Sequence, residues 1–297
     1  MKRLRSSLML VALFAVGALV LAPGASAKAK GFKYGVATGD VSAKSAILWA
    51  RASKEGKTLI QISDGGGFGN CNLKNASNKY IVKAEKSNDL TVQKQINKLD
   101  PDTAYKFRFC MNGGKKSDTG HFKTAPKANK AKTIHFALAG DQDARPIPGK
   151  SKPYWNNFQV WDRIRAQDND FNILMGDTIY SDTEVPGYTL NDVAVSTDQK
   201  RAAYKLNLGE KAWTKARGSA AYYAHWDDHE FINDFSQEEN KFPYSNDGVD
   251  QGTTHINGHK LYKQGVKAFT EYNPVSYSDK TGIYRTCLLY TSDAADE

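Results

Sequence analysis

The sequence lacks the motifs that identify two large classes of enzyme. It has no Gly-x-Ser-x-Gly elbow, which would present a serine nucleophile, and no complete Walker loop of the form Gly-x-x-x-x-Gly-Lys-Ser/Thr. It also has no internal repeat and no long low-complexity tract. A mechanism built on an activated serine or on a nucleotide-binding loop is therefore not expected.

Only the N-terminus contains a long apolar run. Basic residues precede the uncharged stretch Leu8–Ala22, and the small residues Ala25–Ala27 suit a signal peptidase. The run is about 15 residues, shorter than the roughly 20 that cross a bilayer, so a cleaved leader over 1–27 is favoured over a membrane anchor. Because Leu4 interrupts the arginine pair, the general secretory route is favoured over a twin-arginine route. We expect export to the periplasm or the extracellular space, with no stable membrane anchor.

The chain is basic, but its basic residues are dispersed. The formal net charge is +9 at pH 7, and removing the three positive charges of the leader leaves +6. No arginine-rich stripe alternates with aromatic residues, so no nucleic-acid binding role is expected. A dispersed charge of this sign favours solubility and the approach of anions.

Cysteine is scarce, with three residues in the chain. In an oxidising compartment Cys71 and Cys110 could form a disulfide, and two free, partly buried thiols are the alternative. The third, Cys287, belongs to a C-terminal stretch that is discussed below.

Residues 32–124 contain short segments that alternate apolar and polar side chains, separated by Gly, Asn, Asp and Ser. This pattern predicts a small antiparallel β-sandwich over 28–126. The turn at Leu99–Ala104 followed by a strand led by Tyr105 is typical of fibronectin-like and immunoglobulin-like sandwiches. Residues 127–132 contain no large apolar side chain and suit a linker.

A different pattern begins at residue 133. An apolar strand at Ile134–Ala139, a helix around Trp155–Ala166 and a second apolar strand at Phe171–Met175 form a β-α-β unit. We therefore predict an α+β protein with a second domain over 133–286. Loops at the carboxyl ends of such strands are where α/β enzymes place their chemistry.

Acidic residues follow each of these two predicted strands and also a third strand-like segment, Ala221–His225. They form three clusters: Asp141 and Asp143, then Gly176-Asp177 with Tyr180 three residues later, and Asp227-Asp228-His229-Glu230. One aspartate after a strand is usually a turn or capping residue. Three carboxylate clusters around one cleft would repel each other unless cations neutralised them. Their order along the chain therefore predicts a metal site.

These motifs resemble those of the metallophosphoesterase superfamily, and the match is closest to the alkaline phosphatase D (PhoD-like) family. The resemblance is carried by NILMGDTIYSD (172–182), WDDHEFINDF (226–235), AFTEYNPV (268–275) and GIYRT (282–286), and by the opening segment 32–53. It implies a four-layer α/β/β/α metallophosphatase domain after the N-terminal sandwich. It also implies hydrolysis of organic phosphate esters.

The resemblance assigns roles to individual residues. Asp177 would bridge two metals, Tyr180 would bind Fe³⁺ through its phenolate, and Asp228 stands where the wider superfamily has a metal-binding Asn. His229 would contact or protonate the phosphoryl oxygens or the leaving group, and Glu230 would orient His229 or form a surface ion pair. Hard oxygen ligands favour Fe³⁺ with Ca²⁺, or Mn²⁺ or another divalent ion.

The first cluster departs from the PhoD-like pattern, in which a Ser-Cys-Gln run supplies a cysteine ligand. Here Asp141 replaces that thiolate, as in ordinary metallophosphoesterases and purple acid phosphatases, and it is expected to be a harder ligand. Asp143 stands where the wider superfamily often has His, so a ligand, a group behind the ligands or a loop residue are all open. Two metals about 4 Å apart would activate a bound water for in-line attack on the phosphorus.

Residues 287–297 do not resemble the continuation that the family would require. They resemble translated adapter sequence, so we expect them to be foreign and the native protein to be longer, with further metal ligands downstream. Two alternatives to a phosphatase remain open at this point: a phospholipase-like phosphodiesterase, and a secreted binding module with an inactive second domain. The sequence does not decide the oligomeric state.

Overall fold

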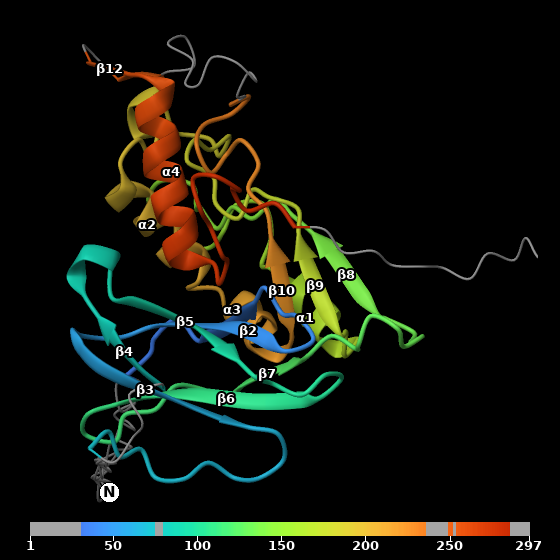
Figure 1. Ribbon diagram of the computed structural model, residues 1–297. Coiled ribbons are helices and arrows are strands. Elements are labelled where there is room, and N and C mark those ends of the chain that lie inside the picture. Colours follow the sequence, from blue (N-terminus) through green and yellow to red (C-terminus); the bar gives the residue numbers. More distant parts are fainter. Residues whose placement is uncertain (1–30, 75–79, 236–248, 252–253, 286–297) are drawn as a thin grey trace, which may run out of the picture.

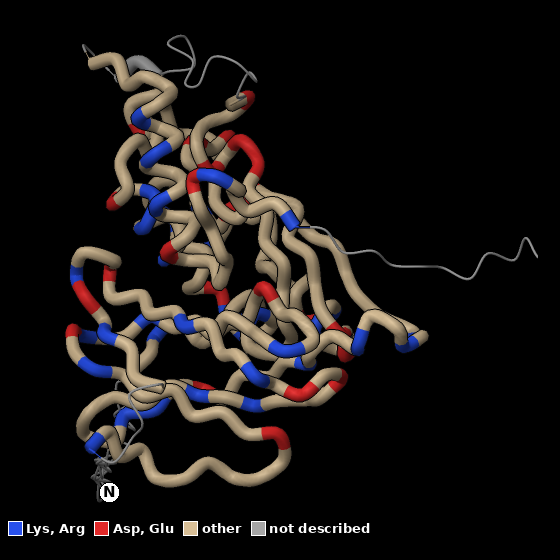
Figure 2. Tube along the Cα trace, in the orientation of Figure 1, with Lys and Arg blue, Asp and Glu red and all other residues tan. Residues whose placement is uncertain are grey.

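The computed structural model describes residues 31–74, 80–235, 249–251 and 254–285. The predicted leader at 1–27 and the stretch 287–297 lie outside these residues. Within them, no helix is both long enough and apolar enough to cross a membrane. Figure 2 shows lysines and arginines distributed along the trace in both halves of the molecule.

The N-terminal half is built from antiparallel strands in two sheets (Figure 1). One group contains β1 (Val36–Gly39), β2 (Ser45–Arg51) and β5 (Thr91–Asn97), with Gly39 opposite Ile47 in the β1–β2 pair. The other sheet has the order β4-β3-β6-β7, from β4 (Ile81–Ala84), β3 (Gly56–Ser63), β6 (Ala104–Met111) and β7 (Gly120–Lys123). The sequence patterns indicated β1, β2, β3, β6 and β7 but missed β4 and β5, whose apolar residues alternate weakly.

Buried apolar side chains from both groups of strands pack against each other, among them Leu48, Ile60, Phe107 and Phe109. Alternation along β6 explains this, because every second side chain of a strand points to the same face. The hydroxyl of Tyr105 accepts a hydrogen bond from the backbone N–H of Asp100 (2.9 Å), which fastens the turn before β6. Cys71 and Cys110 form a disulfide.

The second half of the chain adds three parallel strands to the sheet that contains β1, β2 and β5. β8 (Phe136–Ala139), β9 (Phe171–Leu174) and β10 (Ala221–Ala224) pair in parallel, and β10 pairs in parallel with β1 at Gly39 and Tyr222. The resulting sheet has the order β5-β2-β1-β10-β9-β8. The protein is therefore a mixed α+β fold in which one sheet joins both halves.

Helices cover this sheet and supply many of the buried side chains of the second half's core. They are α1 (Gln159–Ala166), α2 (Thr197–Asn207), α3 (Lys211–Ser219) and α4 (Gly258–Tyr272), with short 3-10 turns η2 (Lys86–Asn88) and η3 (Leu190–Asp192) and a two-stranded ribbon of β11 (Val249–Gln251) and β12 (Thr254–Ile256). α1 begins at Gln159, later than the pattern indicated, because Phe158 has a left-handed backbone (φ 58°).

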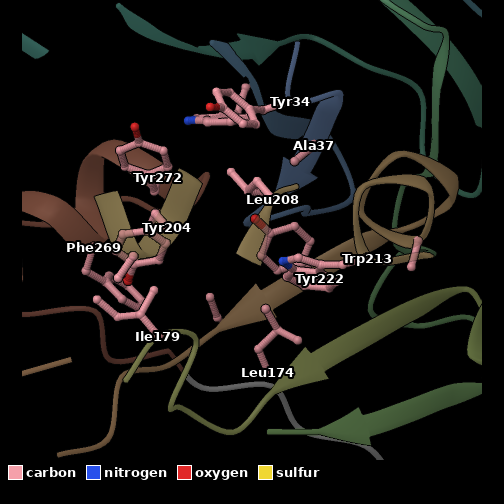
Figure 3. Close-up of a cluster of buried hydrophobic side chains, with 14 of the residues drawn as sticks. Tyr34, Ala37, Leu174, Ile179, Tyr204, Leu208, Trp213, Tyr222, Phe269 and Tyr272 are labelled. Carbon is pink, nitrogen blue, oxygen red and sulfur yellow. The ribbon is translucent and has the colours of Figure 1, made fainter. Parts of the chain in front are cut away.

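The core of the second half takes side chains from both halves of the chain (Figure 3). Trp49 from β2 is fully buried there, and its indole N–H donates to the carbonyl of Glu271 at 2.7 Å. Tyr272 lies beside Tyr204 with ring centroids 4.9 Å apart. α4 therefore packs against β2 and β5 of the N-terminal half, and α2 packs against α4.

Candidate metal centre

The loops that follow β8 and β9 both turn sharply as soon as the strand has ended. Asp141 and Asp177 have left-handed backbones, with φ of 55° and 48°. Such a conformation costs free energy in a residue with a side chain, so it is maintained only where the surroundings require it. The backbone N–H of Gln142 donates to the carbonyl of Asp177 (2.8 Å), which ties the two turns together.

Gly176 lets the loop after β9 approach the loop after β10. Its φ is 108°, and a Cβ at this position would lie 2.5 Å from Cβ of Asp227 and 2.6 Å from the backbone nitrogen of Asp227. No side chain fits at such distances. The glycine of the Gly-Asp motif is thus required by the contact between the second and third acidic clusters.

Asp177, Asp228 and His229 converge at this contact. Each offers a ligand atom, and these atoms lie within 4.8 Å of one another. Among the described residues, neither aspartate forms an ion pair with a lysine or an arginine. Burial, opposed by His229 and aided by the carboxylates of Asp228 and Asp227, raises the pKa of Asp177 to about 6. A bound cation would relieve the repulsion among these carboxylates.

Tyr180 lies at the edge of this group and connects it to Asp141. Its hydroxyl donates to Oδ1 of Asp141 (3.0 Å), and its ring stacks on His229 with centroids 4.0 Å apart. Burial, together with the hydrogen bond to Asp141, raises the pKa of the Tyr180 phenol well above its ordinary value. Asp141 is thus next to Tyr180 but outside the group formed by Asp177, Asp228 and His229.

Asp182 holds the His229 ring, and the sequence patterns did not single it out. Nδ1 of His229 lies 2.9 Å from Oδ1 of Asp182, and the other carboxylate oxygen accepts from the backbone N–H of Asn233 (3.0 Å). Burial alone would lower the pKa of His229, but Asp182 outweighs it and the pKa rises to about 9. Asp182 is the last residue of the motif NILMGDTIYSD, and this position was the signal in the sequence that could have indicated it.

Glu230 is buried, not on the surface, at 1% exposure. Its carboxylate accepts from the backbone N–H groups of Asp177 (3.2 Å), Thr178 (2.6 Å) and Asp227 (2.9 Å). Burial raises the pKa of Glu230 to about 7. The side chain therefore fastens the Gly-Asp loop to the loop after β10.

Asp143 is also buried, and its carboxylate accepts hydrogen bonds from its own loop and from the loop after β9. It accepts from the backbone N–H of Arg145 (2.9 Å) and from the hydroxyl of Thr183. These contacts join the loop after β8 to the loop after β9. The side chain is not part of the group formed by Asp177, Asp228 and His229.

Comparison with models of protein families assigns the chain to a family. The model described as PhoD-like phosphatase matches residues 149–289, and that of the PhoD-like phosphatase N-terminal domain matches residues 18–126. The chain belongs to the PhoD-like phosphatase family. This confirms the family that the motifs indicated. Asp141 and Asp143 lie between the two matched ranges.

A solved structure of PhoD supports the same fold. A structure of PhoD superposes on this PhoD-like chain with a TM-score of 0.61 at 19% identity, over 84% of this chain and 47% of that one. A purple acid phosphatase from yellow lupin (Lupinus luteus) seeds matches at a TM-score of 0.46 and 12% identity, over 80% of this chain and 40% of that one. The chain thus spans about half the length of the PhoD structure. A search of curated proteins finds no significant match.

The donor atoms of the PhoD-like chain fit a hard metal ion. Carboxylate oxygens of Asp177 and Asp228 and an imidazole of His229 form the group, with the Tyr180 phenol and the Asp141 carboxylate beside it. Neither cysteine among the described residues offers a thiolate, because Cys71 and Cys110 form a disulfide. Oxygen-rich sets of this kind suit Fe³⁺, Ca²⁺ or Mn²⁺ better than soft metals.

Proposed function

We propose that the chain is a metal-dependent phosphoester hydrolase that acts outside the cytoplasm on organic phosphate esters. The observation that carries the proposal is the convergence of Asp177, Asp228 and His229 on one point, with two carboxylates that form no ion pair with a lysine or an arginine among the described residues. Membership of the PhoD-like phosphatase family supports the reaction class. The basic N-terminus, the apolar run and the small residues of 1–27 support export.

The proposal includes a two-part organisation of the chain. Residues 28–126 would form a fibronectin-like or immunoglobulin-like sandwich, and 133–286 would belong to a four-layer metallophosphatase domain, with 127–132 between them. The packing of the β4-β3-β6-β7 sheet on β2 and its neighbours supports the first part. The parallel strands β8, β9 and β10, with acidic loops at their carboxyl ends, support the second.

Asp177 and Asp228 would hold the metal ions, with Tyr180 and Asp141 as further oxygen donors and His229 beside them. Bound metals supply Lewis acidity that activates water and stabilises charge on phosphoryl oxygens. Glu230 keeps the Asp177 backbone at a set distance from the Asp227 backbone through its hydrogen bonds. The ligands therefore face each other before a cation arrives, which lowers the cost of ordering them.

His229 is suited to proton transfer, because Asp182 holds its Nδ1 and leaves Nε2 as the nitrogen that can face a substrate. We assign His229 the donation of a hydrogen bond or a proton to the phosphoryl or leaving-group oxygen. Asp182 is a positioning residue for that ring. The stacked Tyr180 ring limits rotation of the imidazole from the other side.

The test compares the purified protein with Asp177→Ala and with a control, Asp162→Ala, whose side chain is half exposed in a surface ion pair with Arg165. Each is assayed on a phosphomonoester and a phosphodiester, with metal analysis. We expect Asp177→Ala to lower kcat/KM at least about a hundredfold and to lose metal, and Asp162→Ala to behave as the parent.

The pattern of results separates the open readings. A higher kcat/KM for the monoester would indicate a phosphatase. A higher kcat/KM for the diester, including a phospholipid, would indicate a phospholipase-like phosphodiesterase. Activity that is unchanged by Asp177→Ala would refute the metal mechanism. Absence of both activity and stoichiometric metal in the parent would favour a secreted binding module.

A further inference from the structure

Lys200 is a fully buried lysine that the proposed chemistry does not use. It lies on α2 with 0% exposure, and no carboxylate among the described residues forms an ion pair with it. Its ammonium donates to Oγ of Ser181 at 2.6 Å and to the carbonyl of Phe231 at 2.9 Å. Its two acceptors belong to different loops of the candidate metal centre.

These two acceptors lie where the loop after β9 contacts the loop after β10. Ser181 follows Tyr180 directly, and Phe231 is two residues beyond His229. The backbone N–H of Ser181 donates to the carbonyl of His229 (2.9 Å), and its hydroxyl to the carbonyl of Glu230 (3.3 Å). One ammonium group thus bonds to the Tyr180 loop and the His229 loop at their junction.

A buried ammonium without a carboxylate partner is costly. Burial lowers the pKa of Lys200 to about 7, which reflects the loss of hydration of the charged form. An apolar side chain of the same length would avoid this cost, and such replacements are often neutral or stabilising. What an apolar side chain cannot supply is two directed hydrogen bonds to two separate loops.

We propose that Lys200 is a positioning residue that holds the Tyr180 loop and the His229 loop in register, so that Asp177, Asp228 and His229 face one another. This inference rests on the proposed metal centre and adds a residue that stands behind it. The loops have no regular secondary structure at these positions, so a few individual hydrogen bonds, those of Lys200 among them, determine their relative placement.

Arg201 provides a matched control, because it is the next residue of α2 and is also buried, at 8% exposure. Its guanidinium donates to both carboxylate oxygens of Glu271 (2.7 Å each) and to the carbonyl of Ser87 (2.7 Å). None of these partners belongs to the metal-centre loops. Removing this cation disturbs the junction between α2, α4 and the η2 turn.

The experiment uses the full chain with Lys200→Met and Arg201→Met. Amide hydrogen exchange is measured over 176–185 and 226–235, and Mn²⁺ binding is measured by calorimetry with Asp177→Ala as the blank. We expect Lys200→Met to speed exchange in both loops and to weaken Mn²⁺ binding at least about tenfold, while global stability is kept. Arg201→Met should lower stability and speed exchange near 86–89, with Mn²⁺ binding within about twofold of the parent.

The two readouts separate this inference from the proposed function. If the wild-type protein shows no Mn²⁺ binding that depends on Asp177, the proposed metal centre is refuted. The amide exchange rates of the two loops would still test the positioning role of Lys200. Parental exchange and parental Mn²⁺ affinity in Lys200→Met would overturn the inference. If Lys200→Met does not fold, Ser181→Ala removes one of the two acceptors, and slower or unchanged exchange in both loops of that variant would equally overturn it.

Discussion

Gly176→Ala tests the contact between the two loops that carry the metal-binding residues. The added methyl group would lie 2.5 Å from Cβ of Asp227 and 2.6 Å from its backbone nitrogen, and the backbone φ of 108° would itself be strained with a side chain. Neither neighbour is the end of a flexible side chain. The loop after β10 would therefore have to move away from Asp177.

The magnitude follows from these two effects. A residue held in an unfavourable backbone region costs about 1–3 kcal/mol. Overpacking of a tight site costs a further 1–3 kcal/mol or so. We expect the free energy of unfolding to fall by about 2–6 kcal/mol, a large share of the 5–15 kcal/mol or so that is typical of folded domains. Relaxation of the loop would reduce the loss of stability but would separate Asp177 from Asp228.

Gly140→Ala is the matched control, because it is a glycine in the neighbouring loop after β8. A Cβ there would lie 3.5 Å from the carbonyl oxygen of Gly176, an ordinary contact, and the backbone is unstrained. Urea unfolding and Mn²⁺ binding are measured for both variants. A Gly176→Ala protein with the stability and the Mn²⁺ affinity of Gly140→Ala would refute the reasoning.

Two further predictions concern the N-terminal half. The Cys71–Cys110 disulfide closes a loop with a sequence separation of 39, so dithiothreitol should lower the free energy of unfolding by about 4 kcal/mol in urea titrations. The pKa of Asp89 falls from 3.8 to about 2, because hydrogen bonds from Arg51, Tyr272 and Lys205 outweigh the effect of burial. A lowered carboxyl pKa stabilises the folded state above pH 4 by about 2 kcal/mol, and this contribution is lost as the pH falls toward 2. Asp89→Asn should therefore be less stable than the parent at pH 7, and the difference should shrink at pH 3.

Each of these predictions has its own control. A Cys71→Ser/Cys110→Ser double variant should be insensitive to dithiothreitol, and a parent protein equally insensitive to it would contradict the first prediction. For Asp89→Asn, the opposing outcome is a stability difference that stays the same from pH 7 to pH 3. That result would mean that the loss comes from packing and not from the ionised carboxylate.

The strands β8, β9 and β10 could be predicted because each is a short apolar run followed by glycine or acidic residues. Their loops could be predicted as a site because parallel strands end at one edge of a sheet. β4 and β5 could not, because IVKA and TVQKQIN alternate too weakly to stand out from the polar segments around them. The start of α1 at Gln159 depended on the left-handed turn at Phe158, which the composition of 155–158 does not reveal.

The sequence by itself determined the family and indicated the residues of the candidate metal centre. Asp177, Asp228 and His229 stand in short motifs whose spacing is set locally, by a strand end and a tight turn, so no long-range information was needed to find them. The same holds for the α+β class, which follows from the change of hydrophobic pattern after residue 132.

Tertiary structure decided which other side chains position the residues of the candidate metal centre. Asp182 holds the His229 ring across two loops, and Lys200 reaches both loops from a helix that is remote from either motif. Tertiary structure also decided that β1 pairs with β10, so that one sheet runs through both halves of the chain. Such contacts join segments whose sequences carry no mark of each other, because they depend on how helices and strands pack once the core has formed.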